Sequence, residues 1–146
     1  MTIVLNVEEI ARKITDKFPD SVVFADKTAV VVKSKSLYQV GKFLKNAPEL
    51  AFDYLTNLVA VDYMDYFEVV YHLISLKYNH SLVLKTRCYE REKPSVPSVV
   101  GIWRSADFQE REAYDLMGIV FEGHPNLRRL LLWEGFVGHP LRRDYL

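Results

Sequence analysis

The side chains best suited to chemistry are concentrated after residue 109, where the chain reads EREAYDLMGIVFEGHPNLRRLLLWEGFVGHPLRRDYL. Three carboxylates, Glu110, Glu112 and Asp115, open this stretch, and paired carboxylates are the groups that general acid and base catalysis uses. Residues two apart on a helix point about 200° away from each other, so Glu110 and Glu112 cannot flank one scissile bond. Glu112 and Asp115 could share a site, but no nucleophile lies beside them in the sequence. Catalysis by this cluster is therefore disfavoured.

Two histidines follow in a weak repeat, Gly-His-Pro-Asn-Leu-Arg-Arg from residue 123 and Gly-His-Pro-Leu-Arg-Arg from residue 138. His124 and His139 would suit a hydrolytic enzyme or a metal site. Zinc usually requires four nitrogen or sulfur ligands at short spacings, and the single cysteine, Cys88, lies far away in the sequence. We therefore expect no metal in this chain. A free-standing hydrolytic enzyme that uses His124 or His139 with the Glu110 to Asp115 cluster remains the less favoured alternative.

Two arginine pairs, at residues 128–129 and 142–143, would suit a phosphate or nucleic acid. Lys plus Arg and Asp plus Glu both number 19, however, so no net charge draws the chain to nucleic acid. All the lysines lie at or before Lys93, whereas most of the arginines come after it. Arginine is the cation preferred in protein contacts, and lysine is depleted from them. The exchange indicates that the C-terminal third contacts a partner protein.

Residues 110–117 are predicted to form a helix, with Asp107 as the N-cap and Glu110 at the capping-box position. Apolar and charged residues alternate around its whole circumference, whereas a solvated surface helix separates them. We expect protein to enclose this helix, with Arg111 within pairing distance of Asp115 one turn away. Its charged residues either form a local network of ion pairs or, as we favour, contact a neighbouring protein.

From Gly118 onward the chain carries four of its six glycines and both Gly-His-Pro triplets, and a residue before proline is pushed towards extended backbone. We predict an extended arm over residues 119–146, after a core domain over residues 1–118. The arm would lie across a neighbouring protein, whose carboxylates its arginines would pair, with an apolar anchor around Trp133. The predicted partner-binding residues are Glu110, Arg111, Glu112, Asp115, His124, Arg128, Arg129, Trp133, His139, Arg142, Arg143 and Asp144.

The spacing of these residues closely resembles a known family. Glu-Arg-Glu from residue 110, Asp-Leu-Met from residue 115, His124, Arg128 and the following Leu-Leu match the signature of the 30 kDa subunit of respiratory complex I. The bacterial form is the C-type subunit of NADH-quinone oxidoreductase, and the plastid counterpart is the J-type subunit. The block from residue 138, Gly-His-Pro-Leu-Arg-Arg-Asp-Tyr, is similar to a second block of that family, with Arg143 for the usual lysine and Leu146 for the usual proline.

The resemblance implies a peripheral subunit without redox cofactors, which packs against the large D-type subunit that shares the quinone pocket and near an iron-sulfur subunit. It implies a place on the cytoplasmic side of the membrane, bound there through the complex. Related subunits occur in membrane-bound hydrogenases and in ferredoxin-driven relatives, so these remain the alternative. The resemblance does not identify the electron donor.

Composition agrees with such a subunit. The chain of 146 residues is 49% hydrophobic, which is enough for one domain with its own core. It has no apolar run of the roughly 20 residues that span a bilayer, and its first residues lack the basic start of a signal peptide. We expect a soluble, cytosol-facing protein. One cysteine cannot hold an iron-sulfur cluster, and no glycine-rich phosphate loop is present.

Hydrophobic periodicity predicts the elements that carry the arm. A helix begins after Asn6, a hairpin covers residues 22–33, and a second helix begins at Ser36. Three strands of an antiparallel meander follow, and their content of β-branched and aromatic residues supports them. Their predicted ranges are residues 52–61, 67–78 and 81–89. The order α-β-β-α-β-β-β, then a helix and the arm, predicts a two-layer α+β fold with a largely antiparallel sheet.

Overall fold

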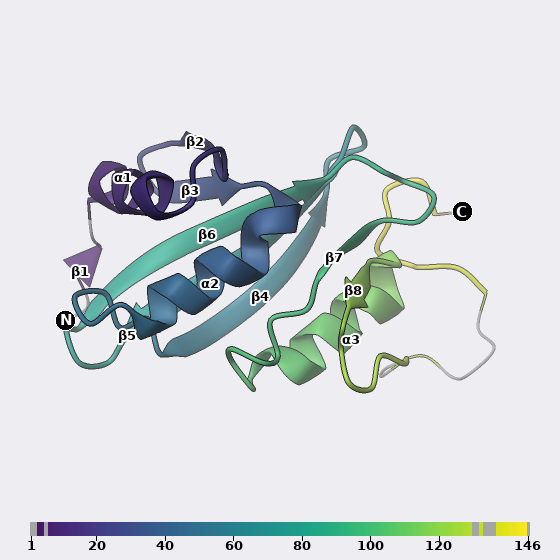
Figure 1. Ribbon diagram of the computed structural model, residues 1–146. Coiled ribbons are helices and arrows are strands. Elements are labelled where there is room, and N and C mark those ends of the chain that lie inside the picture. Colours follow the sequence, from purple (N-terminus) through teal and green to yellow (C-terminus); the bar gives the residue numbers. More distant parts are fainter. Residues whose placement is uncertain (1–2, 5, 130–131, 133–136, 146) are drawn as a thin grey trace.

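Three long antiparallel strands, β4 (Tyr54–Asp62), β5 (Phe67–Ser75) and β6 (His80–Cys88), form the centre of the molecule (Figure 1). The computed structural model describes residues 3–4, 6–129, 132 and 137–145. In β6 every second residue is buried, as expected for a sheet that is covered on one side. These three strands confirm the predicted meander, with ends shifted by a few residues.

The sheet continues beyond β6 with the predicted hairpin, β2 (Val22–Ala25) and β3 (Ala29–Val32), in the order β2-β3-β6-β5-β4. Strand β3 pairs with β6 in parallel, and so does the short strand β1 (Ile3–Val4), which the sequence reasoning missed. The sheet is therefore mixed but largely antiparallel, and β4 forms one of its edges.

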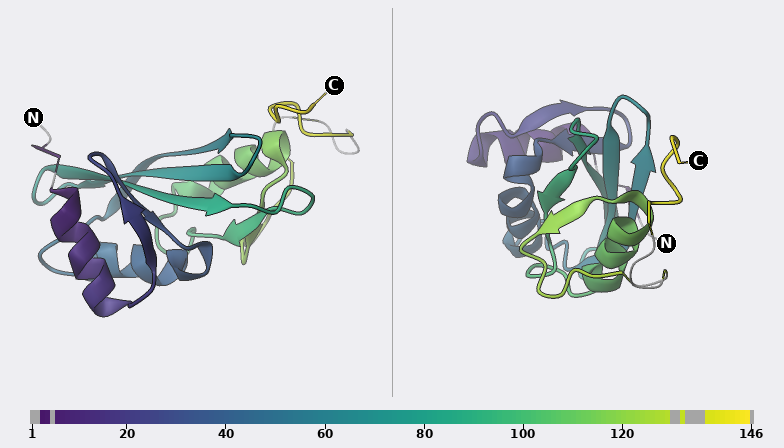
Figure 2. Two further views of the ribbon diagram at one scale, coloured as in Figure 1. Left: turned by 90° about the horizontal axis from the view of Figure 1, so that it is seen from above. Right: turned by 90° about the vertical axis from the view of Figure 1, so that its right-hand side faces the viewer.

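Two amphipathic helices, α1 (Val7–Lys17) and α2 (Leu37–Asn46), pack on one face of the sheet (Figures 1 and 2). The Asn6 side chain accepts hydrogen bonds from the backbone N–H groups of Glu8 and Glu9, which confirms the predicted cap of α1. Helix α2 follows a single 3₁₀ turn, η1 (Ser34–Ser36). Their apolar stripes belong to the same hydrophobic core as the inner residues of β5 and β6.

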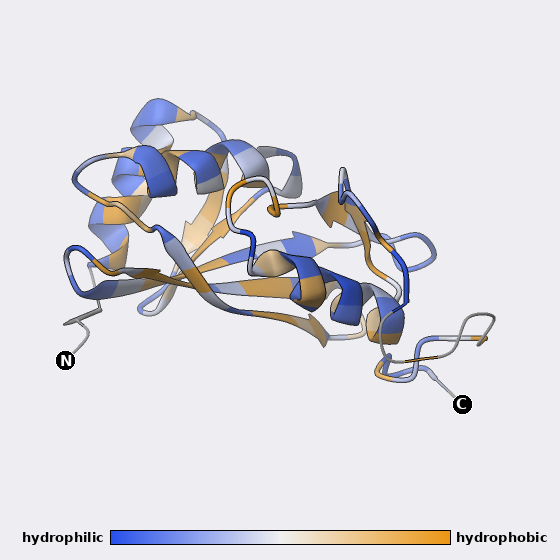
Figure 3. Cartoon of the chain, turned by 90° about the horizontal axis from the view of Figure 1, so that it is seen from below, coloured by the Kyte–Doolittle hydropathy of each residue, from blue (hydrophilic) through white to orange (hydrophobic). Residues whose placement is uncertain are grey.

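Helix α3 (Ala106–Met117) lies along β4 and ends at Gly118, as predicted, but it begins earlier than the prediction (Figure 3). Ser105 is the N-cap residue, and Asp107 already lies in the first turn, so the predicted Asp107 cap is wrong. The turn before α3 leads directly into it, since the backbone N–H of Ala106 donates to the carbonyl of Trp103. Glu110 is therefore not at the capping-box position, and its side chain makes other contacts.

The connector after β6 contains a short strand, although its prolines indicated an irregular segment. Strand β7 (Ser95–Pro97) pairs in parallel with β8 (Val120–Glu122), which directly follows α3. Ile119 and Phe121 are fully buried in the common core. The first residues of the predicted arm therefore belong to the domain, and the boundary after Gly118 is wrong at this point, because these apolar side chains complete the core beneath α3. Trp103 is also a core residue.

Candidate functional site

The candidate site consists of α3 and the segments that pack against this helix. Glu110 lies near the middle of α3. The Glu110 carboxylate is fully buried and accepts hydrogen bonds from the Ser98 hydroxyl, at 2.6 Å, and from the Val99 backbone N–H, at 2.8 Å. Burial raises the pKa of Glu110 to about 7, and the two hydrogen bonds oppose this rise. Burial, and after it the charge of nearby Glu110, raises the pKa of the Tyr71 hydroxyl. Glu112, two residues on, is exposed, so the two glutamates do point apart.

Asp115 is the second buried carboxylate of α3 and connects the helix to the first basic pair. It is fully buried, lies 3.4 Å from the Arg129 guanidinium and accepts a hydrogen bond from the Leu132 backbone N–H at 2.9 Å. Arg111 lies elsewhere: its Nε donates to the Arg128 carbonyl at 3.3 Å. The expected enclosure of α3 is therefore correct for one face only.

Residues 137–145, which we call the tail, cap the C-terminal end of α3. The last carbonyls of a helix have no partners within the helix. Here the His139 ring lies 3.0 Å from the Asp115 carbonyl, the Leu141 N–H donates to Leu116 at 2.9 Å, and Arg142 donates to Met117 at 2.6 Å. A cation at this end also complements the helix dipole. The second Gly-His-Pro block thus folds back on its own domain and is not an extended arm.

Gly118 makes this fold-back possible in two ways. Its backbone has a φ of 79°, which glycine adopts without strain. A Cβ at this position would lie 2.7 Å from the His139 ring and 2.8 Å from the Arg142 guanidinium, so any side chain would displace the tail. Gly118 therefore both ends the helix and provides the space in which His139 and Arg142 pack.

His124, from the first Gly-His-Pro triplet, contacts the opposite end of α3. Its Nδ1 accepts a hydrogen bond from the Asn126 backbone N–H at 2.9 Å, so Nε2 must carry the proton in the neutral ring. Nε2 lies 3.0 Å from the Asp107 carboxylate and 3.3 Å from the Asp107 carbonyl. Both ring nitrogens are occupied by structural contacts.

The two histidines do not form one site. They contact α3 at Asp107 and Asp115, eight residues apart, which is about 12 Å along a helix. No group of three potential metal ligands lies together among the residues that the structure describes. The hydrolytic alternative would use either histidine with the Glu110 to Asp115 cluster, but the His124 ring is held by Asp107 and Asn126, and the His139 ring contacts the Asp115 carbonyl.

Asp62, at the end of β4, holds the tail to the sheet, and the sequence reasoning missed it. Asp62 is 5% exposed, and its carboxylate accepts two hydrogen bonds from Arg91, at 2.7 and 2.9 Å, and one each from the backbone N–H groups of Arg143 and Met64, both at 2.8 Å. Arg91 also reaches Asp144 at 3.1 Å, and both Arg91 and Arg142 lie over the Phe67 ring. A single aspartate at a strand end carries no local signal, so only the tertiary structure could identify it.

The predicted partner-binding residues therefore divide into two groups. Most of them are held by contacts within the chain: Glu110, Asp115, His124, Arg129, His139, Arg142 and, through Arg91, Asp144. Glu112, Arg128 and Arg143 are exposed, and Arg111 is partly exposed. Trp133 lies outside the described residues. Arg143 belongs to the tail, which also exposes two apolar residues, Val137 at 87% and Leu141 at 56%.

The family comparison and the similar sequences point to the same family. The family described as "Respiratory-chain NADH dehydrogenase, 30 Kd subunit" matches residues 30–146. A C-type subunit of the NADH-quinone oxidoreductase of Roseiflexus sp. (strain RS-1) is 42% identical over 141 residues, which cover 94% of this chain and 80% of that protein. A C-type subunit of the NADH-quinone oxidoreductase of Rhizobium meliloti (strain 1021) is 46% identical over 120 residues, or 80% of this chain and 65% of that protein.

Two solved structures share the fold. The trypsin-resistant fragment of Nqo5 superposes with a TM-score of 0.61 at 32% identity and covers 84% of this chain and 100% of that chain. A chain of the membrane-bound sulfane sulfur reductase, described as an archaeal respiratory membrane complex, gives a TM-score of 0.66 at 27% identity and covers 86% of this chain and 75% of that chain.

Proposed function

Since the chain belongs to the family of 30 kDa subunits of respiratory-chain NADH dehydrogenase, we propose that it is a cofactor-free structural subunit in the peripheral arm of an NADH-quinone oxidoreductase. Its task is to dock on neighbouring subunits, chiefly the large subunit that shares the quinone site, and to stabilise their assembly. Electrons pass through other chains of the complex. The proposed position is at the cytoplasmic face of the membrane, reached through those neighbours.

One observation carries this proposal. The family signature residues hold the tail and Arg129 against α3 and β4. The residues that stay exposed, which we call the docking surface, are Arg128, Arg143, Val137 and Leu141. Apolar residues together with arginine are the composition expected at a protein interface. Because this surface is already ordered, docking would require little further loss of conformational entropy.

The proposed peripheral position agrees with the helices. In the part of the chain that the structure describes, no helix is long and apolar enough to cross a membrane. Contact with the membrane would therefore come from the neighbouring subunits.

A second candidate is the equivalent subunit of a different respiratory membrane complex. The similarity to a chain of the membrane-bound sulfane sulfur reductase supports it, because the same fold serves there in another assembly. The neighbouring genes distinguish the two candidates. Genes for nucleotide-binding subunits beside this one favour the NADH-quinone complex, and hydrogenase-like genes favour the alternative.

Reversal of the exposed cations tests the docking surface. In the double variant Arg128→Glu, Arg143→Glu, the isolated chain should unfold at the temperature of the wild type, because both side chains are exposed. Incorporation into the complex should fall at least tenfold, since the carboxylates of the neighbour would then face like charges. Co-purification with an affinity-tagged neighbouring subunit measures this.

The matched control is Lys27→Glu, Lys35→Glu, which changes the net charge equally at exposed positions away from the tail. It should incorporate as the wild type does. Full incorporation of the arginine variant, or equal loss in both variants, would contradict the proposed docking surface.

A further inference from the structure

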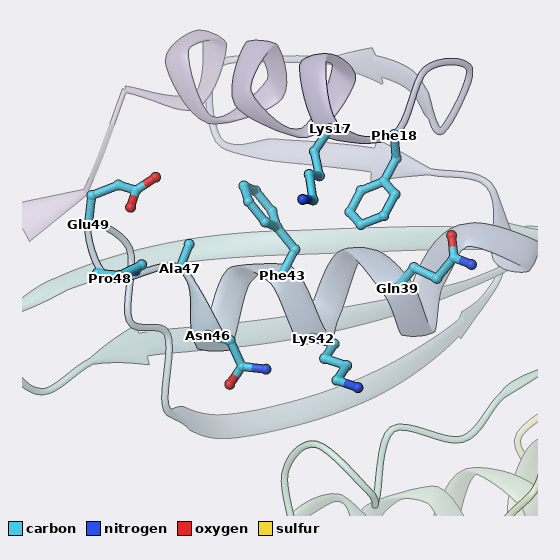
Figure 4. Close-up of a pocket in the computed structure, with 9 residues that line it drawn as sticks. All are labelled: Lys17, Phe18, Gln39, Lys42, Phe43, Asn46, Ala47, Pro48 and Glu49. Carbon is cyan, nitrogen blue, oxygen red and sulfur yellow. The ribbon is translucent and has the colours of Figure 1, made fainter.

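A second surface lies at the other end of the molecule from the tail, in an open groove between the end of α1 and the outer side of α2 (Figures 1 and 4). The groove has a volume of roughly 580 Å³. It lies apart from α3, β4 and the tail, so the docking surface proposed above does not account for it.

Two aromatic rings form the floor of this groove. Phe18, at the end of α1, and Phe43, on α2, meet edge to face with their centroids 6.0 Å apart, and both remain partly exposed. Figure 4 shows both rings turned into the space between the helices, with Ala47 and Pro48 at one end. Half-exposed aromatic rings gain free energy when a further apolar side chain covers them.

Two lysines give the groove its charge. Lys17 on α1 and Lys42 on α2 line it, and neither has an ion pair with any residue that the structure describes. The acid that lines the groove is Glu49, which lies 3.9 Å from Lys13. In Figure 4 the Lys17 ammonium is turned towards the space beside Phe43. The groove therefore combines an aromatic floor with two positive charges.

From this combination we infer that the groove is a docking site for an acidic, amphipathic segment of a neighbouring subunit. An apolar or aromatic side chain of that segment covers Phe18 and Phe43, and its carboxylates pair with Lys17 and Lys42. Amphipathic segments commonly bind to proteins in grooves of this kind. The groove is open to solvent, so a protein segment can extend along it.

The α1 side of the groove lies outside the region that the family model matches, because this region begins at residue 30. The site is thus a feature of this chain that the shared family region alone does not form. The inference rests on the proposed function in one respect, namely that the chain sits in an assembly with other subunits.

A photo-crosslink in the assembled complex tests the inference. The photoreactive amino acid p-benzoylphenylalanine replaces Asn46, which is exposed and lines the groove. In a second variant it replaces the exposed Lys27 as the control position. Irradiation at Asn46 should give a crosslink to one neighbouring subunit, at a peptide that contains both apolar and acidic residues. The control position should not react with that peptide.

Charge reversal then tests the chemistry of the contact. Lys17→Glu, Lys42→Glu should lower the crosslink yield at Asn46 at least tenfold, whereas the equally charged Arg12→Glu, Lys35→Glu should not. Exchange of the acids of the crosslinked peptide for lysine should restore the yield with the Lys17→Glu, Lys42→Glu chain. Circular dichroism should show that all these chains fold.

Three results would overturn the inference: no crosslink above that of the control position, a crosslinked peptide without acids, or a crosslink to a second copy of this chain. A chain that fails to co-purify with the complex would instead contradict the proposed function. The two failures are therefore distinguishable in the same preparation.

Discussion

Glu110 shows how one buried carboxylate links the connector to α3. Ser98 and Val99, which directly follow β7, donate hydrogen bonds to its carboxylate. Burial raises the pKa of Glu110 from 4.5 to about 7. The unfolded chain therefore loses this proton at a lower pH than the folded chain. Stability from this group is fully present below pH 4.5 and is lost as the pH rises to about 7.

Glu110→Gln should remove this pH dependence. The amide oxygen can accept from Val99, and the amide nitrogen can donate to the Ser98 hydroxyl, which turns to accept. The wild type should lose about 3 kcal/mol of unfolding free energy between pH 4.5 and 7 from this one group. Urea unfolding across that pH range measures the slope. Equal slopes in the two chains would show that Glu110 titrates normally.

Asp62 has the opposite dependence on pH. The Arg91 guanidinium holds the pKa of Asp62 well below its usual range, and two backbone N–H groups lower it further. Its stabilising contribution is present above about pH 4 and is lost as the pH falls further. Asp62→Asn should cost roughly 2 to 4 kcal/mol at pH 7 and much less near pH 2, because the buried pair loses one partner.

The control for Asp62 is Asp144→Asn. Asp144 contacts the same arginine, but its side chain is 50% exposed, so its loss should cost under about 1 kcal/mol. Urea unfolding measures both variants. Equal losses would show that the tail is not held through Asp62.

The sequence was sufficient to select several residues of the site, but it did not predict their contacts. Glu110, Asp115 and the two histidines stand out because of their types and spacing. Their contacts depend on residues elsewhere in the chain, such as Ser98 for Glu110, which carry no local pattern. The assignment of Glu110 to a capping box was wrong because the turn around Trp103 moves the helix start to Ala106.

At the C-terminal end of α3, Gly118 determines whether the tail can dock. Gly118→Ala would introduce strain at a positive φ and would also press a methyl group into His139 and Arg142. The expected result is release of the tail, with trypsin cleavage after Arg142 and Arg143 at least tenfold faster. Limited proteolysis with mass spectrometry measures the cleavage.

Gly123→Ala provides the matched control. Gly123 has a φ of 84°, but nothing lies within 4 Å of a Cβ at this position. The variant should carry only the backbone strain of about 1 kcal/mol and keep the tail docked. If both variants released the tail equally, strain and not the contact with His139 would be responsible.

The elements of the domain were predictable because each has a local signal. The Asn6 cap, the apolar stripes of α1 and α2, and the β-branched content of β4 to β6 identified them. The strands β1, β7 and β8 have two or three residues each and depend on pairing with distant partners, so no periodicity marks them.

Across the whole molecule, the principal correction concerns residues 119–146. Of this range the structure describes residues 119–129, 132 and 137–145, and the glycine and proline content gave no information on where these residues lie. Long-range contacts decide this: Phe121 in the core, Leu141 at the end of α3, and the Arg143 backbone on Asp62. The result is a domain with the tail folded on it at one end and an aromatic groove at the other.

The tail is folded on its own domain before it meets a neighbour. Hydrogen exchange of the isolated chain, followed by NMR at the amides of Leu141 and Arg143, tests it most directly. Both amides should be protected at least a hundredfold relative to a free peptide, because they donate to Leu116 and Asp62. If both amides exchanged at the free-peptide rate, the tail would not be folded on the isolated domain. The prediction of an extended arm would then be correct.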